Sequence, residues 1–477
     1  MKFKATKKQI LALLAAVVMT VGLAACGGDD ETKVTPTPTE VTEETEQTEE
    51  TEQTDETDET DETDETDVTT QVTDGEPGDP SAELDWSGIT QIDVRSYAKF
   101  KQRGYMVGYQ HGIDNFVADH EGVEVLNKTG GMYGDDPEGD MASNIASGSI
   151  WNLQFMAITH LPDKMLTSGL YTPLTEYIDW EDPFYDKDFM TNTMFLGDYY
   201  GIANQGMQEV DLMVYNPKDY ELLNLPTPRE CYENGEWNFD KITEYATLMT
   251  ERPFLYIGTL CTAFPGYWGA TLYTINEDGS LENNFVSQGT TDFFKFFETL
   301  YKIPLGINGS APWRNPVGDA MLSSAKVTEI VDDTTLQMFL DGEREYVPFP
   351  TSSSGNAAPT SMNGWMFSVP RTGKNIKASI VLAQYMCNGM TDGIKASVDQ
   401  LSQEDQDYYW AITANPVQRL YEFPGVRNPF TGTNAKADGL GNKYDEALDG
   451  KPYSTYIETE NTSLKEEIAA YNSKFIN

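Results

Sequence analysis

Basic residues, histidine and cysteine are all scarce in this sequence. Its 477 residues include 32 Lys and Arg against 77 Asp and Glu, which gives a formal net charge of −45. A nucleic-acid surface needs clustered Lys and Arg to neutralise phosphates, and the body of the chain holds no such run. The excess of acid therefore argues against nucleic acid as a partner. It favours neutral or cationic ligands over anions.

The three histidines, His111, His120 and His160, match no catalytic pattern. None lies in an HExxH motif or near a GxSxG motif, and the chain has no Gly-rich phosphate loop and no calcium loop of the usual spacing. We therefore predict a protein that is not an enzyme and needs no cofactor or metal. One catalytic alternative remains, because two of the many carboxylates could hydrolyse a glycosidic bond.

Four cysteines exclude a disulfide scaffold. Cys26 belongs to the N-terminal segment discussed next, which leaves Cys231, Cys261 and Cys387. These three can form at most one disulfide, and no CxxC pair occurs. We interpret these cysteines as buried thiols, two of which could form a disulfide. The sequence does not decide whether that disulfide forms.

Long apolar runs are missing except at the start of the chain, where residues 10–25 are uncharged and rich in Leu, Ala and Val. Four lysines precede this run, which is too short for a comfortable membrane span and ends in small residues, as a signal peptide does. Residues 23–28 read Leu-Ala-Ala-Cys-Gly-Gly and resemble the bacterial lipobox. The resemblance predicts a signal peptide over 1–25 and a lipid on Cys26. The folded part would then lie on the extracellular face of the cell membrane, held by the lipid alone.

The next segment, residues 26–80, is of low complexity. Thr recurs every third residue from Thr39 to Thr66, with Glu, Gln or Asp between, apart from Val41. Such a chain has almost no apolar surface to bury and its charges repel, so we predict a disordered, extended stalk. At about 3.1 Å per residue it would reach on the order of 150 Å, which suits a thick Gram-positive envelope. Cation or partner binding by the acids is an alternative, and glycosylation of the threonines stays open.

From residue 81 the composition is that of a globular protein with alternating strands and helices. The pattern predicts covered sheets of an α/β architecture, and nearly 400 residues predict two lobes. Expected strands cover residues 92–94, 123–126, 150–156, 199–203, 210–215, 346–349 and 365–369. Expected helices cover residues 106–119, 140–146, 161–167, 216–223, 240–249, 291–301, 375–386, 403–412 and 463–475.

Several stretches of the body, in order, resemble the extracellular solute-binding proteins of ABC importers, family 1, sugar-binding type. They are residues 116–125, 141–148, 168–178, 200–203 with 212–216, 234–241 and 364–375. The middle stretches read Met-Ala-Ser-Asn-Ile-Ala-Ser-Gly and Asn-Gly-Glu-Trp-Asn-Phe-Asp-Lys, close to landmarks of that family. The chain departs from the family at residues 148–152 and 318–321, so its ligand is not carried over.

The resemblance implies a periplasmic-binding-protein-like fold of type II, in which two α/β lobes joined by a hinge close on a ligand in the cleft between them. It implies lobe 1 from residues 81–211 and 370–400, and lobe 2 from residues 212–369 and 401–477. It also implies permease subunits of an ABC transporter as partners. We expect a monomer whose only membrane contact is the anchor.

A sugar offers flat C–H faces to aromatic rings and hydroxyls to polar side chains. The residues expected to bind the ligand are therefore rings beside Gly- or Pro-rich turns and polar residues near the first crossing between lobes. These are Trp151, Tyr267, Trp268, Trp313 and Trp365, together with Asn204, Gln205, Glu209, Asp211 and Arg314. The leading hypothesis is the capture of a mono- or oligosaccharide. The alternatives are a peptide or other polar solute on the same fold, and a wall-anchored glycan hydrolase.

Overall fold

The structure is a computed structural model that describes most of the chain from residue 84 onward. The described residues are 84–100, 104–129, 137–157, 169–190, 193–195, 197–249, 253–256, 272–276, 279–305, 307–308, 320–352, 361–371, 374–414, 417–418 and 453–476. The chain divides into two units, Met1–Val72 and Thr73–Asn477, and the account below concerns the second. The predicted signal peptide, the lipidated Cys26 and the stalk lie outside the described residues.

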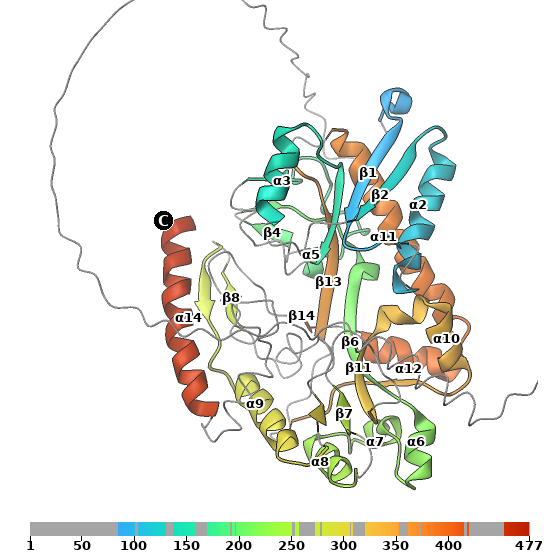
Figure 1. The fold of residues 1–477 in the computed structure, drawn as a ribbon, viewed down its shortest axis with the longest axis vertical. Helices are drawn as coiled ribbons and strands as arrows, with labels where there is room; N and C mark the ends of the chain where they lie inside the picture. The colour runs from blue at the N-terminus through green and yellow to red at the C-terminus, as the bar shows by residue number, and fades with distance from the viewer. Residues whose placement is uncertain are drawn as a thin grey trace, which may run out of the picture. The chain divides into compact units, whose positions relative to one another are not determined.

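The first lobe is built on parallel strands with apolar residues at alternate positions. β1 pairs in parallel with β2 on one side and with β3 on the other, and β13 is antiparallel to β3. Ile92 and Val94 of β1 are fully buried, as the alternation predicts. Figure 1 shows α2 and α11 on one side of this sheet and α3 on the other. The elements are β1 (Gln91–Ser96), β2 (Glu124–Thr129), β3 (Leu153–Ala157), β13 (Ser361–Ser368), α2 (Val107–Asp119), α3 (Pro137–Ala146) and α11 (Ile376–Val398).

The second lobe is built around β6. This strand pairs antiparallel with β11, β12 and the first half of β13, while β7 pairs in parallel with β10 and β11. A further strand, β14, pairs with β13. The strands are β6 (Gln208–Tyr215), β7 (Leu255–Tyr256), β10 (Ile307–Asn308), β11 (Leu322–Lys326), β12 (Glu345–Val347) and β14 (Val417–Gln418). The helices are α6 (Pro217–Leu222), α7 (Pro228–Glu233), α8 (Phe239–Thr247), α9 (Gln288–Tyr301), α10 (Asp333–Leu340) and α12 (Gln403–Thr413).

The remaining described elements are two small hairpins, short helical turns and a long C-terminal helix. The hairpins are β4 (Met194–Phe195) with β5 (Asp198–Tyr199), and β8 (Tyr273–Ile275) with β9 (Leu281–Asn283). The helices are α5 (Lys187–Met190) and α14 (Tyr453–Phe475), and the 3₁₀ turns are η1 (Trp86–Gly88), η3 (Gly104–Met106), η6 (Gln205–Met207) and η9 (Val327–Val331).

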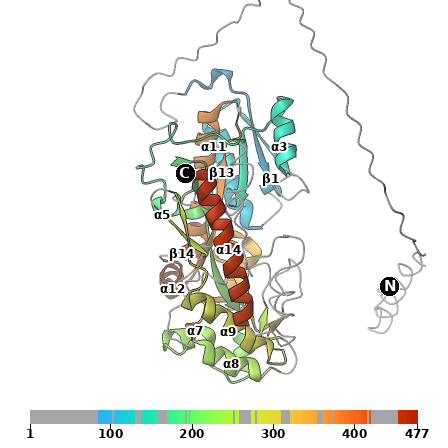
Figure 2. The same ribbon diagram turned by 90° about the vertical axis from the view of Figure 1, so that its left-hand side faces the viewer.

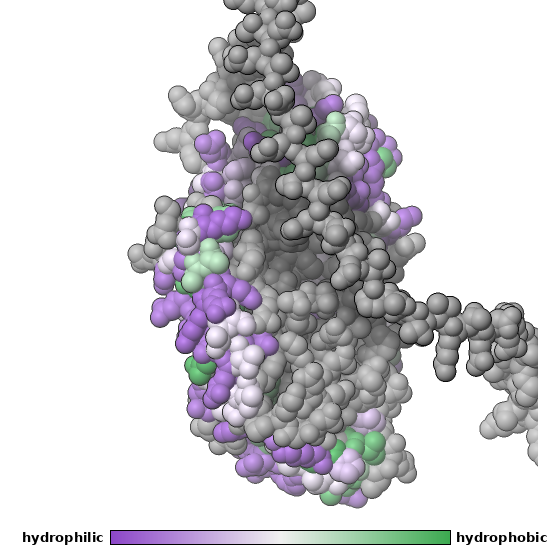
Figure 3. Space-filling model, turned by 60° about the vertical axis from the view of Figure 1, so that its left-hand side comes forward, coloured by the Kyte–Doolittle hydropathy of each residue, from purple (hydrophilic) through white to green (hydrophobic). Residues whose placement is uncertain are grey.

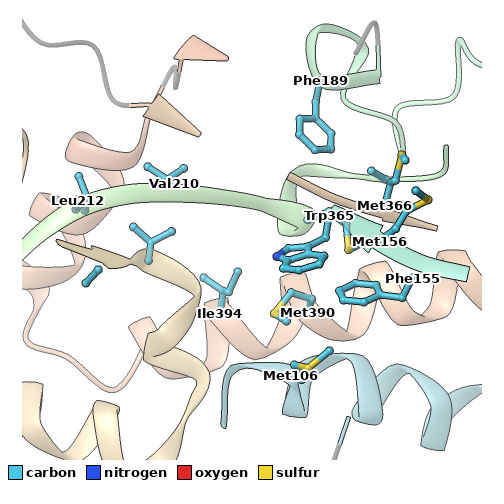
Figure 4. Packing of buried hydrophobic residues seen from close by; sticks show 14 of the residues in the cluster. Met106, Phe155, Met156, Phe189, Val210, Leu212, Trp365, Met366, Met390 and Ile394 are labelled. Atoms are coloured by element: carbon cyan, nitrogen blue, oxygen red, sulfur yellow. The ribbon is translucent and has the colours of Figure 1, made fainter. Parts of the chain in front are cut away.

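Strand β13 connects the two lobes. Its residues up to Gly364 pair with β6 of the second lobe, and its residues from Trp365 pair with β3 of the first. Figure 4 shows buried side chains packed around this point, with Phe189 on one side of the strand and Met390 of α11 on the other. The strand expected at 365–369 is therefore confirmed as a crossing between lobes. The residue boundaries proposed for the lobes stay a prediction, since the change of pairing falls between 364 and 365.

Local sequence signals account for where several helices begin. Asn216 caps α6 with Pro217 in its first turn, and the Thr227 and Glu230 side chains form a capping box at α7. Ser402 caps α12, because its Oγ accepts a hydrogen bond from the Asp405 N–H at 3.2 Å. Two helices are longer than expected: α11 continues to Val398 and α14 begins at Tyr453. On the face in Figure 3 the described residues are mostly hydrophilic, as a surface in water requires.

Candidate functional site

The carboxyl ends of parallel strands from both lobes meet at the crossing strand. β3 ends at Ala157, which pairs with Trp365 of β13. β11 ends at Lys326, which pairs with Asp211, and Asp211 pairs in turn with Ser361 of β13. Ligands of open α/β sheets bind outside the carboxyl ends of the strands. This edge, where the two lobes join, is therefore the candidate binding site.

Three aromatic rings form a cluster at this edge. The Trp365 ring lies nearly parallel to Phe155, with centroids 4.8 Å apart, and to Tyr97, with centroids 5.1 Å apart. Trp365 is only 5% exposed, whereas Tyr97, which directly follows β1, is half-buried. Tyr97 is thus the most exposed ring of this cluster. Trp365 is the ring that holds it in place.

A cation from the second lobe completes the cluster. The Lys326 Nζ lies 5.7 Å from the centroid of the Trp365 ring, a distance at which a cation is attracted to the face of an indole. Because Lys326 ends β11 and Tyr97 follows β1, the two lobes contribute to one group of side chains. The arrangement combines an aromatic surface with a charged hydrogen-bond donor.

The Trp365 indole also carries a buried polar atom. Its Nε1 is shielded from solvent and has no hydrogen-bond partner among the described residues. A buried donor left unpaired costs about 1–3 kcal/mol, so such a group is expected to bind water or a ligand. The predicted site residue Trp365 therefore lies at the junction of the lobes with a donor that no described residue uses.

Trp151 lies in the first lobe beneath a charged pair. The Arg95 guanidinium covers its ring at 4.0 Å and donates a 2.6 Å hydrogen bond to Asp140 of α3. The Trp151 ring is 5% exposed, and its Nε1 has no partner among the described residues. Arg95 and the half-exposed Asp140, rather than the Trp151 ring, are accessible to solvent here.

Asn204 contacts the long helix α11. Its Oδ1 accepts a 3.0 Å bond from the Gly206 N–H and a longer one, 3.4 Å, from Thr391, while its Nδ2 lies 3.4 Å from Asn388 Oδ1. These bonds tie the segment before β6 to α11. The Asn204 amide is thus used in packing against α11 in this structure.

Three of the other predicted polar residues lie in β6 or in the turn directly before it. Asp211 is fully buried within β6. Gln205 lies in η6, and Glu209 lies in β6 opposite Asn363. Tyr267, Trp268, Trp313 and Arg314 lie outside the described residues. In the sequence, the first two follow β7 and the last two follow β10, so both pairs come after strands whose carboxyl ends point toward the candidate site.

Sequence reasoning missed Tyr97, Lys326 and Arg95. Arg95 and Tyr97 stand at the end of a strand that the sequence predicted only as residues 92–94, although the alternation of Ile92 and Val94 with polar residues continues to Ser96. A ring directly after a strand was the available signal for Tyr97. No local signal marks Lys326, because the sequence of β11, Leu-Ser-Ser-Ala-Lys, is poor in β-branched residues.

Three further observations concern the described residues alone. No group of three or more His, Cys, Asp or Glu side chains there is arranged to hold a metal ion. None of the helices found there combines the length and the apolar character needed to span a membrane. Cys231 and Cys387 are buried free thiols. The third candidate for a disulfide, Cys261, lies outside the described residues.

The order of strands, the crossing strand and the edge shared by both lobes define the fold as periplasmic-binding-protein-like of type II, as predicted. No protein-family model and no curated protein matches the sequence. Solved structures do match. One is the galacto-N-biose-/lacto-N-biose I-binding protein of an ABC transporter from Bifidobacterium longum, in complex with lacto-N-biose. It has a TM-score of 0.59 and 15% identity, over 82% of this chain and 99% of that one.

Two more similar structures come from other bacteria. An ABC substrate-binding protein from Listeria monocytogenes, in complex with cycloalternan, has a TM-score of 0.55 and 14% identity, over 81% of this chain and 99% of that one. The maltose/maltodextrin-binding domain from Bdellovibrio bacteriovorus, bound to maltotriose, has a TM-score of 0.54 and 14% identity, over 80% of this chain and 100% of that one. At such identities the likeness establishes the fold. These neighbours are binding proteins rather than enzymes.

Proposed function

We propose that this chain is the substrate-binding lipoprotein of an ABC importer and captures an extracellular mono- or oligosaccharide by closing its lobes. The observation that carries the proposal is the group formed by Tyr97, Trp365 and Lys326, where strand ends of both lobes meet. Rings suit the C–H faces of a sugar, and charged donors suit its hydroxyls. The saccharides bound by proteins of the same fold support this ligand class.

The proposed mechanism is capture without catalysis. When the lobes close on a ligand that contacts both of them, the ligand and the edge of the sheet are shielded from water. The hinge absorbs the change in backbone angles. Permease subunits would then recognise the loaded form. In this proposal Cys26 carries a lipid, the signal peptide 1–25 is removed, and a monomer is held at the outer face of a Gram-positive membrane. The stalk 26–80 would set its reach.

The residues proposed to contact the ligand fall into two groups. Tyr97, Lys326 and Trp365 come from the described edge, with Arg95 and Asp140 beside it. The remaining sequence-based candidates stay proposals, namely Trp151, Asn204, Gln205, Glu209, Asp211, Tyr267, Trp268, Trp313 and Arg314.

A thermal-shift panel on the purified chain tests the ligand class. Lacto-N-biose, maltotriose, mannobiose and cycloalternan form one arm, and a set of short peptides forms the other. A ligand that binds only the folded state stabilises that state by about 2.7 kcal/mol when its concentration is a hundred times its Kd. The melting temperature should therefore rise with saccharide concentration. A rise with peptides alone would contradict the sugar proposal and support the other polar solutes.

Two further measurements separate the remaining alternatives. Turnover of a cell-wall glycan by the purified chain, lost when one carboxylate is replaced, would support a glycan hydrolase instead. Labelling of cells with a radioactive fatty acid tests the anchor. The chain should take up label, Cys26→Ala should not, and label retained by Cys26→Ala would contradict lipidation at this residue.

A further inference from the structure

The long C-terminal helix α14 packs against the second lobe through an unusual side-chain contact. Asn472 Oδ1 accepts a 2.8 Å hydrogen bond from the Leu281 N–H, and Asn472 Nδ2 donates a 2.9 Å bond to the Leu281 carbonyl. One amide side chain thus makes the pair of bonds that a neighbouring strand would make with β9. Tyr471 beside it is buried. In the sequence the β8–β9 hairpin lies between β7 and α9 and leads directly into α9, so we assign it to the second lobe, and this contact attaches α14 to that lobe.

The same last turn of α14 also contacts the first lobe. The Phe475 ring meets Phe195 of β4 edge to face, with centroids 5.8 Å apart, and Phe195 is only 7% exposed. The hairpin β4–β5 belongs to the first lobe. The Tyr199 N–H of β5 donates to Thr175 Oγ1 at 3.0 Å, and the Tyr199 carbonyl accepts from the Leu174 N–H at 2.8 Å. Figure 2 shows α14 running from the level of α9 to that of α11 and β13.

We propose that α14 is a strap between the lobes. In its last turn Asn472 holds it to β9, and three residues on Phe475 bears on Phe195 of the first lobe. Among the described residues the lobes also join through β13, the segment before β6, and the packing around α11. A contact outside these connections resists opening, because any rotation about the crossing strand must separate the Phe195 and Phe475 rings or detach α14. The strap therefore sets how far and how often the unliganded lobes open.

The strap predicts the effect of removing either ring. An edge-to-face aromatic pair is worth enough to change an equilibrium by roughly two- to tenfold. Phe475→Ala and Phe195→Ala should each raise the ratio of open to closed molecules by that factor. Asn472→Ala should do the same, because it removes the two hydrogen bonds that attach the last turn of α14 to β9. The double variant Phe195→Ala/Phe475→Ala should open no further than either single variant, because both remove one contact.

Distance measurements between the lobes test this on the full chain without a ligand. Spin labels carried by a noncanonical amino acid replace Ser147, beyond α3 of the first lobe, and Thr247 in α8 of the second. Both positions are exposed, and the native cysteines stay unlabelled. Phe475→Ala should move part of the population to longer distances. Ser473→Ala, an exposed position in the same turn, is the matched control and should leave the distribution unchanged.

Folding is checked separately, so that a loss of structure is not mistaken for opening. Circular dichroism should match that of the parent, and Phe475→Leu, which keeps an apolar contact without the ring, should give an intermediate distribution. A folded Phe475→Ala chain with the parent distribution would overturn the strap. So would equal opening by Ser473→Ala, or additive effects of the Phe195 and Phe475 changes. None of these readouts depends on whether the ligand is a sugar.

Discussion

At the scale of single residues, Tyr97 is the side chain on which the proposed sugar site depends most. It follows β1, lies nearly parallel to Trp365 and remains half-exposed, whereas Trp365 and Phe155 are buried. Tyr97→Ala should weaken binding of any saccharide that stabilises the chain by about 1–2 kcal/mol, roughly tenfold in Kd, because the platform is lost. Tyr97→Phe should bind nearly as well. Isothermal titration calorimetry measures both.

The matched control for Tyr97 is Tyr232, an exposed ring on α7 of the second lobe. Tyr232→Ala should leave the Kd unchanged. If Tyr97→Ala binds as tightly as the parent while remaining folded, the ligand lies elsewhere than on this ring.

Asp405 is a second informative residue, and it concerns stability rather than binding. Its carboxylate accepts 2.6 Å hydrogen bonds from Arg229 and from Ser402. Burial alone would raise the pKa of Asp405, but these two hydrogen bonds outweigh burial and hold the pKa below its ordinary value. A carboxyl with a depressed pKa stabilises the fold above its unfolded pKa of about 3.9, and this stabilisation is lost as the pH falls through the folded value.

Asp405→Asn should therefore lower the free energy of unfolding near pH 7 and flatten its decline below about pH 5. The Asp405 side chain is 45% exposed, so solvent screening limits the effect to at most about 1 kcal/mol. Urea unfolding followed by tryptophan fluorescence at several pH values measures it. Glu404→Gln is the control, because Glu404 bonds the same arginine from a far more exposed position. An equal acid dependence in both variants would contradict the assignment to Asp405.

At the scale of elements, the closest packing is between α2 and α11. A Cβ added at Gly112 of α2 would lie 2.2 Å from the Tyr385 carbonyl oxygen and 2.5 Å from the Met386 Cα, both backbone atoms of α11. A Cβ at Gly389 of α11 would meet the Gly112 nitrogen at 2.4 Å. The two backbones touch, so neither position tolerates a side chain.

Gly112→Ala should destabilise the chain by about 2–3 kcal/mol, since overpacking against backbone outweighs the gain in helix propensity. Thermal unfolding measures the loss. Gly393→Ala is the matched control one turn along α11. Its added Cβ would lie 3.2 Å from a Val331 methyl, which can shift, so stability should change by less than about 1 kcal/mol. Equal losses at the two positions would show that backbone contact is not the cause.

The elements also show why the sequence predicts some features and not others. The crossing strand was predictable because Trp365 to Val369 is a run of good strand formers between Gly364 and Pro370. By contrast, β11 is polar and short, and it exists because β6 and β7 supply its hydrogen-bond partners on both sides. The site follows the same rule. The candidate ring Trp365 was found from local context, but its partners Tyr97 and Lys326 come near it only through the fold.

At the scale of the whole molecule, the lobes are not independent bodies linked by flexible chain. β13 hydrogen-bonds to β6 in one lobe and β3 in the other without a break, and α11 packs against both α2 and η9. A Cβ added at Gly364 would lie 2.0 Å from the buried Phe189 ring, so even the turning point of this strand is tightly packed. Such continuity should couple the unfolding of one lobe to that of the other.

Calorimetry of the purified chain should accordingly show one unfolding transition that includes both lobes. A bound saccharide should raise the temperature of this single transition without splitting it, because a ligand held by strand ends of both lobes stabilises both lobes. Gly364→Ala should lower the transition temperature and broaden or split it, since the clash with Phe189 disturbs the strand that couples the lobes. Gly88→Ala, whose Cβ would meet nothing within 4 Å, is the control and should leave it unchanged. Two transitions in the parent chain, only one of which moves with the sugar, would mean that the ligand binds a single lobe and that closure is not driven by contact with both.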